Sequence, residues 1–154
     1  MSRYYRMMLG SKGAHTALCL RENFIGILDE TGDLSARLNG DFESFQQSTK
    51  PQNDRHFTEY HYRTIWTVCH EVQIGDVILG RGRPGEYAVG EVTSDYFHRP
   101  NEILGHRRAM KWSTRRVARG DMSPALKSVT ALYDTIVPLH DDHAREITTL
   151  IGKL

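Results

Sequence analysis

Apolar residues along the chain occur in short runs and helical stripes that are separated by turn residues. The run YYRMML at 4–9 predicts a first strand. A helix over 11–22 is predicted to follow, with Ser11 as its N-cap and Asn23 as a left-handed stop. The apolar stretch FIGIL at 24–28 then predicts a buried second strand.

The middle of the chain begins with a segment rich in turn-forming residues. Residues 29–40 contain aspartates and glycines that break any period, although DLSARL allows one helical turn capped by Asp33. A short helix is predicted over 41–48, and the composition of 49–55 predicts a surface connection within one domain. Apolar residues then recur at helical spacing and predict an amphipathic helix that ends before Gly75. This stripe consists of Tyr62, Ile65, Trp66, Cys69 and Val72.

The second half of the chain is dominated by strand patterns. Two apolar runs within 76–92 flank the turn sequence RGRPG and predict a β-hairpin. AMKW at 109–112 and TIVPL at 135–139 are further strand candidates, and 141–153 predicts a terminal helix capped by one of its first two aspartates. Many short strands and a few helices together predict an α+β fold, with a curved, mostly antiparallel sheet or partial β-barrel flanked by helices.

Length and composition narrow the class of protein. A chain of 154 residues suffices for one domain with a real core, so a single domain over 1–154 is predicted. Lysine and arginine number 20 against 19 acidic residues, so any nucleic-acid surface must come from where the charges lie. Cys19 and Cys69 lack a CxxC or Cys/His pattern, which disfavours disulfides and structural zinc. Since no apolar run approaches the ~20 residues of a membrane span, we expect a soluble cytoplasmic protein.

The chain lacks the residue patterns of common catalytic sites. A restriction-type nuclease needs paired acids followed by Glu-x-Lys, yet Glu91, on the strand beside Asp76, is followed by no such lysine. His15 with Cys19, and HDDH at 140–143, have metal-ligand residue types, but the aspartates of HDDH are better explained as helix caps. Nucleophile-elbow and dinucleotide motifs are missing from the sequence. We therefore expect a non-catalytic protein with no cofactor and no metal.

A cationic stretch with interleaved aromatic residues starts at the hairpin tip. Its cations are Arg81, Arg83, His98, Arg99, His106, Arg107, Arg108, Lys111, Arg115, Arg116 and Arg119. Its aromatic residues are Tyr96, Phe97 and Trp112. Cations for phosphates beside rings for stacking are what a nucleic-acid surface needs. A run of arginines is also typical of a solvated face, and the rings are equally typical of a core.

Several motifs along 4–112 carry a resemblance to a known family. They are YYRMMLGSKGAHTALCLRENFIGI, DLSARL, IWTVCHEVQIGDVIL, EYAVGEVTSDYFH and HRRAMKW. This pattern resembles the N-terminal modules of modification-dependent (type IV) restriction systems of the Mrr and McrB kind. Those modules are similar in turn to the EVE and YTH domains of the PUA superfamily. The resemblance implies a curved sheet or partial barrel with flanking helices, and recognition of a modified base that is flipped into a pocket.

The resemblance also implies which residues form the site. The base-pocket candidates are Ser11, Phe24, Leu28, Asp29, Asp33, Trp66 and Tyr96. The candidates for contacts to the nucleic-acid backbone are Arg81, Arg83, His98, Arg107, Arg108 and Lys111. Related modules often carry a tryptophan just after the second strand, where this chain has FIGILDE, so stacking would fall to Trp66, Tyr96 or Phe24. For Trp66 and Phe24, a place in the core is the competing interpretation.

The expected function is therefore recognition of a methylated base in double-stranded DNA on behalf of a restriction nuclease. On this hypothesis the chain is a domain of a larger restriction protein or a separate specificity subunit, and its partner is a nuclease or a GTPase. An RNA-binding PUA-like module is one alternative, and a small metal-dependent hydrolase that uses surface histidines is another. The base read is 5-methylcytosine, 5-hydroxymethylcytosine or N6-methyladenine.

Overall fold

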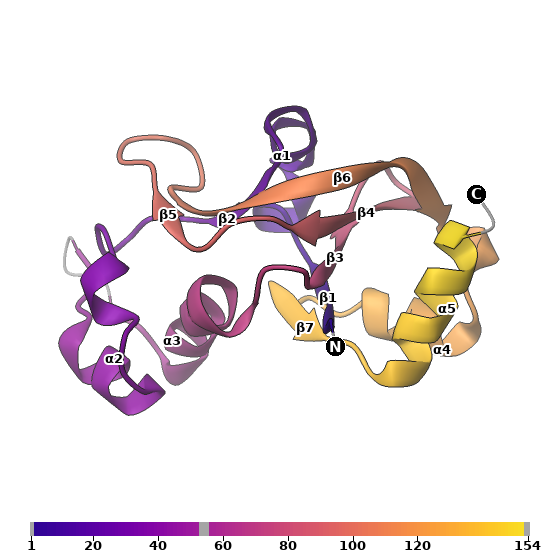
Figure 1. Ribbon diagram of the computed structural model, residues 1–154. Coiled ribbons are helices and arrows are strands. Elements are labelled where there is room, and N and C mark those ends of the chain that lie inside the picture. The colour runs from indigo at the N-terminus through magenta and orange to yellow at the C-terminus, as the bar shows by residue number, and fades with distance from the viewer. Residues whose placement is uncertain (1, 53–55, 153–154) are drawn as a thin grey trace.

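Short strands with buried, β-branched or aromatic residues build one curled mixed sheet, which forms a half-barrel flanked by helices (Figure 1). The computed structural model describes residues 2–52 and 56–152. Its strands are β1 (Tyr4–Met7), β2 (Phe24–Ile27), β3 (Val77–Arg81), β4 (Glu86–Val92), β5 (Phe97–His98), β6 (His106–Ala118) and β7 (Ile136–Pro138). Its longer helices are α1 (Thr16–Glu22), α2 (Phe42–Ser48), α3 (Glu59–Trp66), α4 (Pro124–Thr130) and α5 (Asp141–Gly152). These elements give the α+β class and the partial barrel that the sequence predicts.

The sheet runs in the order β2, β6, β4, β3, β1, β7, with β5 paired to β6. Only the β1–β3 pair among these strands is parallel. The sheet bends where the pairing of β4 with β6 shifts register between Ala88 and Gly90. At this bend the Trp112 ring lies so close that a Cβ on Gly90 would be 2.6 Å from it. The Trp112 indole N–H donates to the carbonyl of Cys19 at 3.1 Å and so ties β6 to α1.

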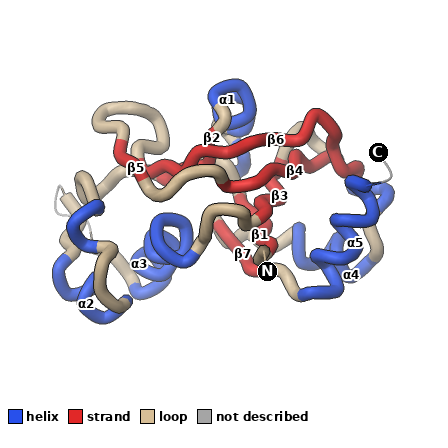
Figure 2. The backbone as a smooth tube through the Cα atoms, in the orientation of Figure 1, coloured by secondary structure: helices blue, strands red, loops and turns tan. Residues whose placement is uncertain are grey.

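Two hydrophobic clusters form the core. The first contains residues of β1, β2, α2, α3 and the π-helical turn Thr67–Glu71, and the second contains residues of β3, β4, α4 and α5. In Figures 1 and 2, α2 and α3 lie at one end of the sheet and α4 and α5 at the other. No helix among the described residues has both the length and the apolar composition needed to cross a bilayer.

Most predicted elements are confirmed, with three main differences. The hairpin, the second strand, the amphipathic helix and the left-handed stop at Asn23 (φ 56°) are all present. Ser11 does not cap α1: Gly10 and Gly13 take positive φ, so 11–13 form a 3₁₀ turn and the helix starts at Thr16. The AMKW strand is part of the much longer β6, and α4 was not predicted. Within the predicted connection 49–55, residues 53–55 lie outside the described residues.

Candidate functional site: a cavity at the end of the second strand

A cavity of about 540 Å³ opens where β1 leads into α1 and where β2 ends. Its other walls come from α3, from Leu104 before β6, and from the segment 133–135 before β7. Ligand sites commonly have volumes of about 300–1,000 Å³ and an apolar lining with a few polar groups. The size and the composite walls of this cavity make it the candidate site.

The floor of the cavity is apolar. Buried side chains supply it, namely Met8, Ile27, Phe57, Ile65 and Leu104. Gly26 also lines the floor, and a Cβ there would lie 2.8 Å from the carbonyl oxygen of Leu104. The missing side chain thus lets the backbone of β2 pack closely against the Leu104 segment.

The rim carries exposed apolar and aromatic side chains. Leu28 is 62 % exposed, Tyr60 is 49 % exposed and Tyr133 is 89 % exposed. Two hydrogen bonds anchor the segment that bears Tyr133. The Thr135 N–H donates to the Tyr60 side-chain hydroxyl at 3.1 Å, and the Met8 N–H donates to the Thr135 carbonyl at 2.7 Å. Since exposed rings lose favourable burial, rings gathered at one opening indicate a surface that a ligand covers.

Polar groups stand on two sides of the opening. Lys12 has a left-handed backbone (φ 54°) between two glycines of positive φ, and with Ser11 it forms the wall at the start of α1. Non-glycine residues in this conformation are concentrated at functional sites. On α3, His61 accepts the Thr58 N–H through Nδ1 at 3.1 Å, and its ring stacks on Phe57. The imidazole is therefore held in place at the wall.

Of the seven predicted pocket residues, Ser11 and Leu28 line this cavity. Phe24 and Trp66 are 2 % and 6 % exposed and belong to the core, so their assignment to a base pocket is wrong. The Arg107 guanidinium lies 3.8 Å from the centre of the Phe24 ring, and the Trp66 ring packs between Phe45 and His70. Both rings are already covered by protein and have no free face for a base.

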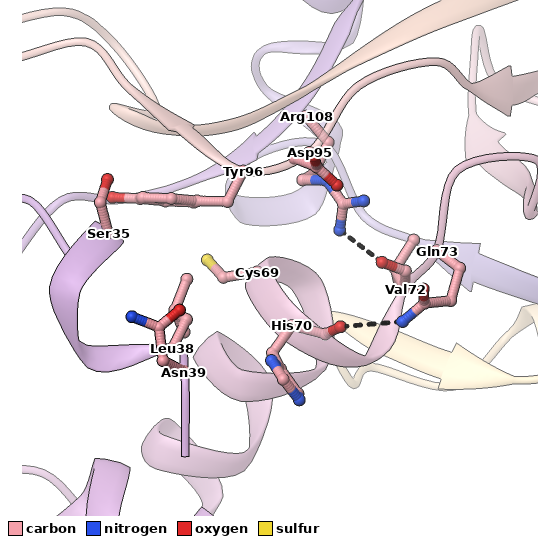
Figure 3. A pocket seen from close by; sticks show the side chains of 10 residues that line it. All are labelled: Ser35, Leu38, Asn39, Cys69, His70, Val72, Gln73, Asp95, Tyr96 and Arg108. Atoms are coloured by element: carbon pink, nitrogen blue, oxygen red, sulfur yellow. Dashed lines mark hydrogen bonds between the residues drawn. The ribbon is translucent and has the colours of Figure 1, made fainter. Parts of the chain in front are cut away.

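Asp33 and Tyr96 lie elsewhere. Asp33 is exposed and accepts the hydroxyl and the N–H of Ser35 at 2.6 and 2.9 Å, which lowers the pKa of its carboxyl group. The 3₁₀ turn Ser35–Arg37 has Leu34 at its N-cap position and no side-chain cap, so the predicted cap at Asp33 is wrong. Tyr96 lines a second cavity of about 350 Å³, together with Cys69, His70 and Arg108 (Figure 3). Burial raises the pKa of the Tyr96 hydroxyl and of the Cys69 thiol, so both groups are neutral at pH 7.

Asp29 joins two histidines in a cluster beside the first cavity. Its Oδ2 lies 2.6 Å from Nε2 of His98, and its Oδ1 lies 3.3 Å from Nε2 of His106. The Tyr96 hydroxyl lies 2.8 Å from Nδ1 of the same His106. Burial lowers the pKa of His106 to about 4, so its ring is neutral at pH 7. Desolvation opposes the low pKa of Asp29, but the bond from His98 and backbone N–H groups outweigh it and stabilise the carboxylate.

The predicted phosphate contacts divide into buried and exposed groups. Arg107 and Arg108 are 6 % and 2 % exposed, so the prediction that they contact a nucleic-acid backbone is wrong. Arg107 donates to the carbonyls of Leu104 and Ile103 at 3.0 and 2.7 Å. Arg108 donates to three carbonyls at 2.6–3.0 Å, those of Ser94, Val68 and Val72. The guanidinium groups of both arginines are therefore bound to backbone carbonyls inside the fold.

Among the other predicted contacts, only Arg81 is placed next to the cavity. Arg81 and Arg83 are exposed, and the Arg81 side chain approaches Gly13 in the turn at the start of α1. Lys111 is exposed on a different part of the sheet, where it lines a cavity beside α5. His98 is bound to Asp29 and is only partly exposed.

The sequence reasoning missed four aromatic residues of the site, which are Phe57, Tyr60, His61 and Tyr133. Tyr60 and His61 precede the apolar stripe of α3, and Tyr133 falls in a turn before β7. Their signal in the sequence was weak, because an aromatic residue off the apolar stripe is found both at binding surfaces and on ordinary solvated faces.

A protein-family model described as Domain of unknown function (DUF8426) matches residues 5–140. No curated protein matches the chain. The matched segment runs from β1 through β7 and contains every wall of the cavity, whereas α5 follows it.

Proposed function

The chain belongs to the family of domains of unknown function DUF8426, and we propose that it is a DNA-binding module that holds a modified base, flipped out of the duplex, in the cavity at the end of β2. The observation that carries the proposal is the combination of a buried apolar floor with exposed tyrosine rings at the opening. The resemblance of the motifs along 4–112 to modification-dependent restriction modules supports the same function.

The chemistry of a flipped base suits such a cavity. A base offers two π faces, and stacking on an aromatic side chain contributes about 1–3 kcal/mol. Tyr133 and Tyr60 stand at the rim, where they can meet such a face. A methyl group on the base would meet the apolar floor, and its burial contributes roughly 0.8 kcal/mol. Polar groups of Ser11, Lys12 and His61 lie at the walls, where they could form hydrogen bonds with the polar edge of the base.

We further propose that the domain acts without catalysis of its own. On this proposal it directs a restriction nuclease or a GTPase, carried in the same protein or in a partner, to modified DNA in the cytoplasm. Backbone contacts would set affinity while the cavity sets selectivity, because phosphates carry no base identity.

The experiment is fluorescence anisotropy with one short duplex in five forms. These are unmodified DNA, the same DNA with 5-methylcytosine, 5-hydroxymethylcytosine or N6-methyladenine, and the matching RNA, at ~150 mM salt so that phosphate contacts are screened. We expect one modified DNA to bind at least about tenfold more tightly than the unmodified duplex, which corresponds to 1.4 kcal/mol. Preference for RNA would replace the proposal by an RNA-binding module, and equal weak binding of all five would refute both.

Arg81 is expected to contact the phosphates that flank the flipped base, because its side chain adjoins the turn at the mouth of the cavity. Arg81→Ala should weaken binding to modified and unmodified duplexes alike and reduce the slope of log K against log salt by about 1. Lys111→Ala is the matched control, since Lys111 is an exposed cation beside a different cavity. If Lys111→Ala changed the salt slope and Arg81→Ala did not, the DNA would contact the part of the sheet that carries Lys111.

A further inference from the structure

We propose that Asp29, His98 and His106 bind a divalent transition-metal ion of the Zn²⁺ type. The three residues come from the loop after β2, from β5 and from the first position of β6. Their ligand atoms all lie within 4.8 Å of one another, and no other group of three such residues is found among the described parts of the chain. The inference is independent of the proposed DNA binding.

The geometry is close to that of a metal centre. Both histidines present Nε2 to the Asp29 carboxylate, at 2.6 Å for His98 and 3.3 Å for His106. Zinc takes imidazole nitrogen and carboxylate oxygen at about 2.0–2.2 Å, so tetrahedral ligand atoms lie about 3.3 Å apart. A small outward movement of the His98 ring would therefore open a position between the three ligands. Two imidazoles with one carboxylate favour zinc, cobalt or nickel over calcium and magnesium, which prefer oxygen.

Surrounding hydrogen bonds already orient two of the ligands. Oδ1 of Asp29 accepts the N–H groups of Gly32 and Thr31 at 2.8 and 3.2 Å, which fixes the carboxylate with Oδ2 directed at His98. His106 is held through Nδ1 by the Tyr96 hydroxyl. Histidine ligands usually have such a partner on the second ring nitrogen, and the partner fixes the tautomer.

The proton on His106 must change place when the ion binds. The Tyr96 hydroxyl accepts the Leu34 N–H at 3.1 Å and lies 2.8 Å from Nδ1 of His106. We assign the ring proton to Nε2 in the metal-free protein, because Nε2 faces the Asp29 carboxylate at 3.3 Å, and the Tyr96 hydroxyl then donates to Nδ1. Nε2 lies 3.1 Å from the Thr31 hydroxyl, which accepts this proton. Coordination through Nε2 moves the proton of His106 to Nδ1, where the oxygen of Tyr96 accepts it, and the Tyr96 hydroxyl then turns its own proton toward the cavity that it lines. The ring of His106 stays neutral in both states. Nε2 of His98, which lies 2.6 Å from the carboxylate, must also release its proton when it coordinates the ion.

Solvent reaches one side of the cluster. The side chain of His106 is fully buried, whereas those of Asp29 and His98 are 19 % and 13 % exposed. The exposed side gives the ion an entry path and leaves room for water as a further ligand, as three-ligand zinc sites require. The ion would clamp the loop after β2 to β5 and β6, and the neighbours of Asp29 in that loop, Leu28 and Glu30, line the candidate cavity.

A matched pair of histidines serves as the control. His140 and His143 lie at the start of α5 with ring centres 5.7 Å apart, beside two exposed aspartates. Adventitious zinc would bind such a pair as readily as the proposed site. His98→Ala is the main variant because His98 is at the surface side of the cluster, and Asp29→Asn is the second because its side-chain oxygen can still accept the Gly32 N–H. His106 is left intact because its burial makes a folding defect the expected result of its loss.

The experiment measures zinc binding to chelator-treated protein by competition with a chromogenic chelator, and follows Co²⁺ binding by visible absorption. We expect one ion per chain, a tetrahedral or five-coordinate Co²⁺ spectrum, and an affinity loss of at least about tenfold in His98→Ala and Asp29→Asn. The double variant His140→Ala, His143→Ala should bind the ion as the unaltered protein does. Circular dichroism verifies that each variant is folded.

Three results would overturn the metal site. They are no bound ion after equilibration with Zn²⁺, an unchanged affinity in folded His98→Ala and Asp29→Asn, and a loss confined to the His140, His143 variant. In the first case the cluster is a hydrogen-bonded clasp between the loop and β6. No DNA is present in this experiment, so its outcome does not affect the anisotropy test of base recognition.

Discussion

Replacement of Arg108 by alanine is expected to lower the free energy of unfolding by about 3–5 kcal/mol, out of the 5–15 kcal/mol that domains of this kind possess. Arg108 is 2 % exposed, and its guanidinium donates to the carbonyls of Ser94, Val68 and Val72. Alanine would leave these acceptors without their donor, and each buried unsatisfied group costs about 1–3 kcal/mol. The two valine carbonyls belong to the π-helical turn and its end, so their release would also loosen the contact of that turn with β6.

Urea unfolding followed by circular dichroism gives the measurement, with the midpoint and the slope fitted separately. Arg115→Ala is the control, because Arg115 is exposed on the same strand and should change stability by less than about 0.5 kcal/mol. Arg108→Lys covers the case in which the alanine variant fails to fold, since lysine keeps the charge but its compact ammonium cannot span the three carbonyls. Equal stabilities of Arg108→Lys, Arg115→Ala and the unaltered protein would contradict the buried position of Arg108.

The expectation for Arg108 also shows where the sequence reasoning failed. Arg107 and Arg108 were assigned to a phosphate-binding surface because they lie in a cationic stretch and because the resemblance implies such contacts. In a strand, however, neighbouring side chains point to opposite faces of the sheet. Arg107 therefore stacks on Phe24 while Arg108 reaches the π-helical turn. Two adjacent arginines of one strand cannot both face a ligand on one side, so the alternation itself argues against the assignment.

Local patterns were sufficient for most of the fold. The hairpin of β3 and β4 follows from apolar runs around a glycine and proline turn, and the stop of α1 follows from Asn23 in the left-handed region. The stripe from Tyr62 to Val72 continues across α3 into the π-helical turn without a change of buried face. Each of these depends on residues that are neighbours in the sequence, where periodicity is informative.

The candidate site depended on long-range packing and was largely missed. Tyr60 and Tyr133 come together because a strand near the C-terminus pairs with β1 and carries the turn before it to the start of α3. Asp29 meets His98 through the pairing of both β2 and β5 with β6. Neither of these tertiary contacts can be predicted from residues that are neighbours in the sequence. The two predicted residues that line the cavity, Ser11 and Leu28, came from the resemblance, which placed the pocket at the start of the first helix and the end of the second strand.

Tyr133→Ala is expected to weaken binding of the preferred modified duplex by about tenfold to a hundredfold, which is the loss of one base–aromatic stack. The ring is 89 % exposed, so the substitution should leave the free energy of unfolding within about 0.5 kcal/mol of its original value. Trp66→Ala should behave in the opposite way, with a loss of about 3–5 kcal/mol of stability from an emptied core position. Anisotropy titrations and urea unfolding of both variants separate the two roles.

Leu132→Ala and Tyr133→Phe complete this test. Leu132 is the exposed neighbour of Tyr133 and is not a cavity residue, so its loss should not change affinity. Phenylalanine keeps the ring and should retain most of the binding, because stacking needs the π face and not the hydroxyl. If Tyr133→Ala left the affinity for the modified duplex unchanged, the ring would not stack on the base. Selectivity would then have to come from the cavity floor alone. Contact of the base's methyl group with that floor gives less than a tenfold difference in affinity.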